Sequence, residues 1–223
     1  MSTPGLMRPA AEPVLLALGA AAAGCLLLSA FAFHAAGRTA ADMLPWARPD
    51  LLAAAMLLVL AGTAIVLLRW LARSYRRLMA EDLPMGYTPA QAVIAWFVPF
   101  ANWIWPFRVL RELLEAVADS RAIDAGREAM LLLCLRWWWG LVLFGSIVEP
   151  LITTRRLMLS TDTAERVRIW LALVGHEGLI AALAAALLLS VLIHIAPALS
   201  RPAARPPAPD AMALYRKRAT RPS

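Results

Sequence analysis

The sequence predicts an all-α integral membrane protein with four transmembrane helices and a proline-broken, amphipathic or re-entrant helical insertion between helices 2 and 3. Hydrophobic residues make up 61% of the 223-residue chain, whereas soluble domains contain about 45–50%. Four apolar runs are each long enough to cross about 30 Å of hydrocarbon as a helix of about 20 residues. A fifth run is interrupted by Pro99 and Pro106, and proline inside a helix kinks or breaks it.

The predicted organisation is one membrane domain between two tails. The tails cover residues 1–13 and 200–223, the second being basic and Pro-rich, and the membrane domain covers residues 14–199. The spans are expected at about 14–33, 51–71, 129–149 and 178–199, and the insertion at about 88–119. The net charge of +7 indicates topology signals and anionic lipid headgroups as partners. No nucleic-acid-reading motif accompanies it, so no nucleic acid is expected to bind.

The first span is predicted to be an uncleaved helix. Residues 22–25 (AAGC) resemble a lipoprotein cleavage box, but the apolar run continues to Phe33, and a cleaved signal peptide has an apolar region of only about 7–15 residues. Cys25 and Cys134 lie in apolar runs at different depths, so we expect packing residues rather than a disulfide. Small residues at four-residue spacing favour packing of the first span on the fourth, or dimerisation; they are Gly19, Ala20, Ala23, Gly24, Gly178, Ala181, Ala182 and Ala185.

The second span is expected to begin after an N-cap at Asp50 and to continue beyond the membrane until Pro84 and Gly86. Four arginines at spacings of three and four share one face of this extension; they are Arg69, Arg73, Arg76 and Arg77. This stripe either orients the span or holds phospholipid phosphates, at about 1 kcal/mol per charge near an anionic surface.

The insertion begins with a predicted capping box, Thr88 with Gln91, and with Pro89 at the first helical position. The excess of Arg and Lys on one side of the membrane is larger when residues 90–107 do not cross, so we expect an interfacial or re-entrant element on the cytoplasmic side. The second half of the insertion is predicted to be an amphipathic helix over 103–118. Trp103, Phe107, Leu110, Leu114 and Val117 form the apolar seam, and Arg108–Glu112 and Arg111–Glu115 form ion pairs.

The third span carries Arg136 followed by Trp137, Trp138 and Trp139. An arginine at that depth must snorkel or pair within the bundle, and Glu112 and Glu115 are the candidate partners. Pro150 is expected to end this helix. A second capping box over 162–165 then opens a short amphipathic helix that ends at Gly175, and the fourth span is expected to break near Pro197.

Three segments together resemble a family of bacterial multi-pass membrane proteins catalogued as domain of unknown function 4328. They are RWLARSYRRL (69–78), AWFVPFANWIWPFRVLREL (95–113) and RWWWGLVL (136–143). The motif positions of the resemblance are Trp96, Phe97, Pro99, Asn102, Pro106, Phe107, Arg111, Glu112 and Trp137 to Trp139. The resemblance covers the middle half to two-thirds of the chain. It implies a multi-pass membrane protein and brings no activity, cofactor or catalytic residue.

No motif in the sequence argues for an enzyme. The histidines are dispersed, so no metal site is predicted from spacing, and no glycine-rich phosphate loop or other cofactor site is present. We therefore expect a non-enzymatic scaffold or accessory protein of the bacterial cytoplasmic membrane, with both termini cytoplasmic, which engages lipid, a protein partner or a second copy of itself. The alternative is a small transporter or channel with a polar cavity around Asn102, Arg136 and Glu112. The structural alternative for Asn102 is to cap the helix that follows it or to satisfy the turn made by Pro99.

Overall fold

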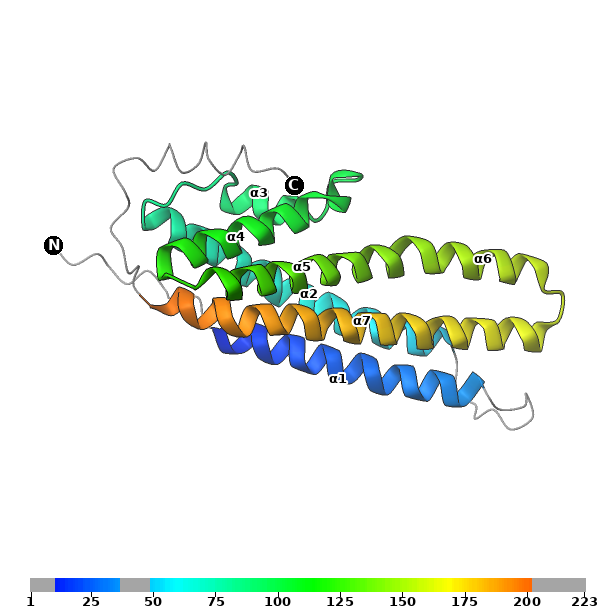
Figure 1. Cartoon of the computed structure of the whole chain (residues 1–223). Coiled ribbons are helices and arrows are strands. Elements are labelled where there is room, and N and C mark those ends of the chain that lie inside the picture. Colours follow the sequence, from blue (N-terminus) through cyan, green and yellow to red (C-terminus); the bar gives the residue numbers. More distant parts are fainter. Residues whose placement is uncertain (1–10, 37–48, 202–223) are drawn as a thin grey trace. The chain divides into compact units, whose positions relative to one another are not determined.

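The computed structural model describes residues 11–36 and 49–201, and every regular element in these ranges is helical (Figure 1). Most of each predicted tail lies outside the described residues. In chain order the elements are α1 (Ala11–Ala36), α2 (Pro49–Ala80), α3 (Pro89–Ile94), the 3₁₀ helix η2 (Ala101–Trp103), α4 (Trp105–Arg121), α5 (Ala125–Leu143), the π-helical turn η3 (Phe144–Val148), α6 (Glu149–Leu159) and α7 (Thr163–Ser200).

Four helical stretches are long and apolar enough to cross a membrane, which confirms the predicted all-α, four-span fold class. They are Glu12–Ala36, Leu51–Ala80, Ala125–Leu159 and Thr163–Leu199. Residues 90–107 contain no such helix, because this stretch is divided between α3, a series of turns, η2 and the start of α4. The six residues of α3 rise only about 9 Å at 1.5 Å per residue.

The prediction that Pro150 ends the third helix is wrong. The helix changes to a π-helical turn, η3, and continues as α6. Pro150 falls in the first turn of α6, directly after η3, so the stretch lacks the hydrogen bond of one N–H but does not end there. The third span and the segment after it therefore form one helical stretch of 35 residues.

The fourth span is also longer than predicted, because neither Gly175 nor Pro197 interrupts α7. A glycine inside a helix costs only about 1 kcal/mol relative to alanine. Pro197 lies within three residues of the end of the helix, so few hydrogen bonds depend on the turn that it disturbs. At the other end of the chain α2 begins at Pro49, which places Asp50 inside the helix rather than at its N-cap.

The end of α2 lies four residues before Pro84. Asp82 has a positive φ of 56°, and the Leu83 N–H donates to the Leu78 carbonyl at 3.1 Å. A left-handed residue with a backward hydrogen bond of this kind terminates many helices, and Asp tolerates the conformation better than most residues. The sequence predicted that the helix ends at Pro84 and Gly86, whereas it ends at Ala80.

The chain divides into two compact units. The first unit comprises the described parts of residues 1–14, 67–135 and 191–223, and the second comprises those of 15–66 and 136–190. The helices α1, α2, α5 and α7 contribute residues to both units.

In the second unit, α1 and α7 run side by side (Figure 1). The buried Ser29 hydroxyl donates to the Gly175 carbonyl at 2.6 Å. A Cβ added to Gly178 would lie 2.9 Å from the Cys25 carbonyl oxygen, and one added to Gly175 would lie 3.0 Å from the Phe33 ring. The predicted packing of the first span on the fourth is confirmed at Gly178, and Gly175, which was not in the predicted set, also lies close to α1.

The other small residues have different neighbours. A Cβ on Gly24 would contact Val59 on α2, and Gly19 has no neighbour within 4 Å of such an atom. Cys25 is fully buried in an apolar cluster with residues of α2 and α7, while Cys134 is half-buried, and both are free thiols. The apolar cluster around Cys25 therefore consists mainly of small and aliphatic side chains.

Candidate functional site

The candidate site lies in the first unit, where the end of α2 packs on α4. Tyr75 is fully buried, and its hydroxyl lies 2.8 Å from the Val109 carbonyl oxygen and 3.0 Å from Glu112 Oε2. A phenol has one proton to donate, so these two acceptors share it. The other carboxylate oxygen of Glu112 accepts a hydrogen bond from the Gly86 N–H. Glu112 thus joins the end of α2 and the following loop to α4.

An ion pair makes a second link between these helices, at their C-terminal ends. Arg121 donates to Glu81 at 2.6 Å, and only 4% of the Arg121 side chain is exposed. Glu81 also accepts from Arg77 at 3.0 Å. A buried cation with a nearby carboxylate is costly to leave without that partner, so this ion pair holds the end of α2 against the end of α4.

The loop between these helices begins as predicted. The Thr88 hydroxyl accepts from the Gln91 N–H at 3.2 Å, and the Gln91 side chain accepts from the Thr88 N–H at 2.8 Å. This is a complete capping box, with Pro89 in the first turn of α3. The helix ends at Ile94: the N–H groups of Trp96 and Phe97 donate to carbonyls three residues back, at 3.2 and 2.9 Å, and Pro99 disfavours helical backbone at the residue before it.

The turns after α3 expose a group of large apolar side chains. We call this group the aromatic rim; its members, with their exposed fractions, are Ile94 (53%), Phe97 (70%), Phe100 (77%), Trp103 (50%), Ile104 (52%) and Trp105 (40%). Phe100 adopts a positive φ of 63°, and its ring meets that of Trp103 edge to face at a centroid distance of 5.9 Å. The broken backbone therefore directs large hydrophobic side chains outward.

The remaining motif residues divide between this rim and the interior. Pro106 is buried at the start of α4, Trp96 and Phe107 are half-buried, and Pro99 is exposed. Asn102 is exposed on η2, and its N–H donates to the Val98 carbonyl at 2.8 Å. The N-cap of α4 is Ile104, which makes no side-chain capping hydrogen bond, so the predicted capping role of Asn102 is wrong.

The helix α4 carries one of the two predicted ion pairs. Arg111 and Glu115 pair at 2.8 Å. Arg108 forms no ion pair within the described residues, because the carboxylate of Glu112 is directed to Tyr75 and Gly86. Of the predicted apolar seam, Leu110, Leu114 and Val117 are buried and Phe107 is half-buried. Trp103 is half-exposed because it precedes the helix, which begins at Trp105.

The four arginines predicted as lipid-headgroup candidates do not behave alike. Arg69, Arg73 and Arg76 are exposed. Arg77 is half-buried, pairs with Glu81 and donates to the Arg201 carbonyl at 3.2 Å. Three arginines of the stripe therefore remain accessible, and the fourth has a structural role.

Arg136 and the tryptophans that follow it belong to the second unit. Arg136 is exposed, Trp137 is 64% exposed, and Trp138 and Trp139 are buried with their ring centroids 5.2 Å apart. Of the three members of the predicted polar cavity, Asn102 is exposed and Glu112 binds Tyr75 and Gly86, both in the first unit, and Arg136 is exposed in the second unit.

Sequence reasoning missed Tyr75 and Gly86 as partners of Glu112. Tyr75 stands within the arginine-rich end of α2 but off the arginine face, and a tyrosine on the apolar side of a helix commonly has a buried hydroxyl that requires a partner. Among residues 11–36 and 49–201, no group of three His, Cys, Asp or Glu side chains is placed to hold a metal ion.

Comparison with known proteins places this architecture in a family. No curated protein and no solved structure matches the chain. The family model described as "Domain of unknown function (DUF4328)" matches residues 47–196, a range that contains α2 to α6, most of α7 and all of the motif residues discussed above. The chain belongs to this family.

Proposed function

We propose that this protein is a non-enzymatic scaffold or accessory protein of the bacterial cytoplasmic membrane, and that its first unit engages the membrane surface. The observation that carries this proposal is the aromatic rim, whose side chains are exposed on turns held in place by hydrogen bonds and an ion pair. Exposed apolar groups of this size in one short segment are typical of membrane or protein interaction sites.

The side chains of the rim suit the membrane interface. Trp and Phe are large apolar groups, and Trp concentrates where hydrocarbon meets water. Phe97 and Phe100 would each gain about 1.5–3 kcal/mol if fully buried in an apolar environment. The amphipathic helix α4 would lie against the same surface, with its buried residues toward the protein and Arg108 toward water.

The exposed arginines at the end of α2 support anionic lipids as the partner. Arg69, Arg73 and Arg76 are held near the end of a candidate span, where each positive charge contributes about 1 kcal/mol of attraction to an anionic surface. The excess of Arg and Lys supports a cytoplasmic location for this surface and for both termini. A protein partner or a second copy of the chain could bind through the basic C-terminal tail.

The depth of the rim in the bilayer tests the proposal. In a Cys25→Ala, Cys134→Ala background, a nitroxide at Phe100→Cys is compared with one at Arg108→Cys in nanodiscs. We expect the label at 100 to be accessible to oxygen and shielded from a water-soluble nickel complex, and the label at 108 to show the opposite. Equal nickel accessibility at both positions would mean that the rim faces water.

The contribution of the arginines is measured separately. Protein with Arg73→Gln and Arg76→Gln is purified from nanodiscs containing phosphatidylglycerol, and the retained lipid is counted by native mass spectrometry. Retained phosphatidylglycerol should fall several-fold relative to Arg108→Gln, the matched control on α4. Unchanged retention of phosphatidylglycerol would mean that these arginines only orient the span in the membrane and do not hold lipid headgroups.

A further inference from the structure

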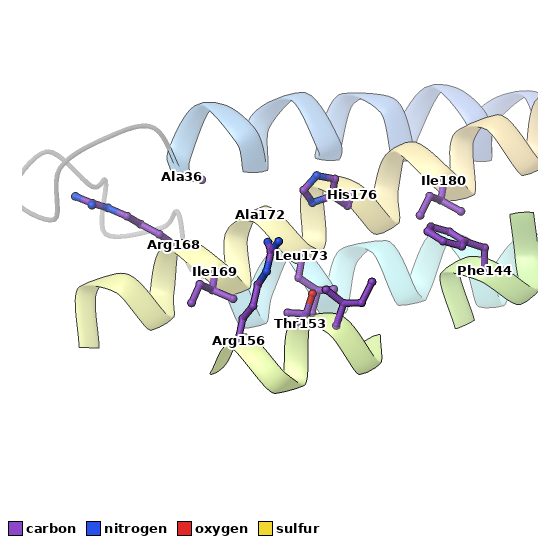
Figure 2. Close-up of a pocket in the computed structure, with 11 residues that line it drawn as sticks. Ala36, Phe144, Thr153, Arg156, Arg168, Ile169, Ala172, Leu173, His176 and Ile180 are labelled. Carbon is purple, nitrogen blue, oxygen red and sulfur yellow. The ribbon is translucent and has the colours of Figure 1, made fainter. Parts of the chain in front are cut away.

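The second unit contains a cavity between α6 and α7 that is unrelated to the aromatic rim (Figure 2). Its volume is about 500 Å³, within the range of about 300–1,000 Å³ found for small-molecule sites. Most of its wall is apolar, and four polar side chains, Thr153, Arg156, Arg168 and His176, join that wall. We infer that this cavity binds an anionic amphiphile, with its carboxylate or phosphate at Arg156 and its aliphatic chain along the apolar wall.

The polar and apolar residues lie at different ends of the cavity. In Figure 2, Phe144 and Ile180 stand together at one end, and Arg156, Arg168 and Ile169 stand toward the other. The Arg156 side chain extends from α6 toward Ala172 on α7, whereas Arg168 extends away from α7. Arg156 is therefore the primary anion ligand, and Arg168 would reach the ligand by changing rotamer.

The charges in the cavity are of one sign. No carboxylate lines it, and neither Arg156 nor Arg168 forms an ion pair with any residue that the structure describes. Both guanidinium groups are exposed, so an incoming anion can reach them. A guanidinium binds carboxylate and phosphate oxygens through paired N–H donors. His176 on α7 also lines the cavity and adds a further hydrogen-bond donor.

The direction of this polarity fits a lipid-like molecule. The stretches Ala125–Leu159 and Thr163–Leu199 rise about 52 and 55 Å at 1.5 Å per residue, so their connected ends extend beyond about 30 Å of hydrocarbon. Arg156 lies within one turn of that connection. Phe144 lies about 18 Å further along the helix axis. A ligand would thus place its head toward water and its chain toward the hydrocarbon, as membrane amphiphiles do.

The π-helical turn shapes the apolar end. Phe144 is the first residue of η3, and π turns in α-helices occur frequently at functional sites. A Cβ added to the next residue, Gly145, would lie 3.1 Å from Ile180. The glycine lets the two helices approach closely beside Phe144 and Ile180, where Glu177 Oε2 would lie 3.3 Å from the same Cβ.

Photo-labelling tests this inference. The full-length protein in phosphatidylcholine nanodiscs is exposed to a diazirine fatty acid, to a diazirine phosphatidylglycerol, and to the methyl ester of the same fatty acid. Labelled peptides are identified by mass spectrometry. Labelling within 144–180 by at least one of the two anionic probes, and at least tenfold less by the ester, supports the inference. The probe that labels more strongly distinguishes a carboxylate head from a phosphate head.

Variants on the same helix provide the control. Arg156→Gln should reduce labelling about tenfold, the effect of losing one charge-assisted hydrogen bond, while Arg156→Lys should retain most of it. Arg155→Gln removes the neighbouring arginine, which does not line this cavity, and should label like the wild type. Ile180→Trp fills the apolar end and should reduce labelling without a change in charge.

The opposite results would overturn the inference. Equal labelling of the Arg156→Gln and Arg155→Gln proteins, or equal labelling by the ester, would exclude an anion site at Arg156. Displacement of the probes by millimolar inorganic phosphate alone would show a simple anion site without a chain-binding function. Labelling that survives Ile180→Trp would place the chain elsewhere.

Discussion

At the scale of single residues, Glu112 is the side chain on which the first unit most depends. It receives hydrogen bonds from the Tyr75 hydroxyl and from the Gly86 N–H, so one carboxylate connects a helix, a loop and a second helix. Because Tyr75 is fully buried, its hydroxyl cannot exchange these partners for water without opening the contact between α2 and α4. The family resemblance identified Glu112 by its position, and the structure assigns it this role in packing.

Replacement of Tyr75 by phenylalanine tests that role. The substitution leaves the Val109 carbonyl and the Glu112 carboxylate without their donor, and we expect a loss of about 1–3 kcal/mol in the free energy of unfolding. The measurement is SDS-induced unfolding in mixed micelles. Tyr87→Phe is the matched control, since the Tyr87 hydroxyl makes no hydrogen bond with the described residues, and should cost a few tenths of a kcal/mol. Equal effects of the two substitutions would show that the buried hydroxyl contributes nothing specific.

At the scale of helices, the paired elements α1 and α7 are held by close backbone approach. The Ser29 hydroxyl reaches the Gly175 carbonyl, and Gly178 faces the carbonyl of Cys25. Membrane helices lack a strong hydrophobic drive toward one another, so small residues that allow such approach contribute much of their affinity.

A methyl group at the tightest point should separate these helices. In Gly178→Ala the new Cβ would lie 2.9 Å from a backbone oxygen, which cannot move independently of α1, and overpacking of this kind costs about 1–3 kcal/mol. Gly19→Ala, where no atom lies within 4 Å, should leave stability unchanged or raise it slightly. Thermal unfolding in detergent compares the two. A Gly178→Ala protein as stable as Gly19→Ala would refute the close contact.

The lengths of these elements show what the sequence could and could not predict. Hydropathy located all four spans, since about 20 apolar residues in a row have few other uses, and the capping box at Thr88 fixed the start of α3. The helix passes Pro150 directly after a π turn, and it passes Gly175 because a glycine inside a helix costs only about 1 kcal/mol. No local sequence pattern predicts that the helices continue past Pro150 and Gly175. For the same reason the cavity between α6 and α7 was not foreseen: its arginines lie far from the family motif and become neighbours only when both helices extend.

At the scale of the whole molecule, the proposed four-span topology requires that the insertion returns to the side of the membrane from which it entered. Spans two and three would then be separated by a long segment, 81–124, on one side of the membrane, and the short α6–α7 connection would lie on the other. The division of residues 90–107 into short helices and turns favours this topology, because lipid-exposed irregular backbone cannot cross a bilayer without its hydrogen bonds being satisfied.

Cysteine accessibility in intact bacterial cells tests this central claim most directly. Single cysteines are placed at Ala41, Asp124 and Ala164 in a Cys25→Ala, Cys134→Ala background, and labelled with a membrane-impermeant maleimide before and after lysis. We expect Ala41→Cys and Ala164→Cys to react in intact cells and Asp124→Cys only after lysis. Reaction of Asp124→Cys together with Ala41→Cys in intact cells would show that residues 90–107 cross the membrane, and would contradict the account.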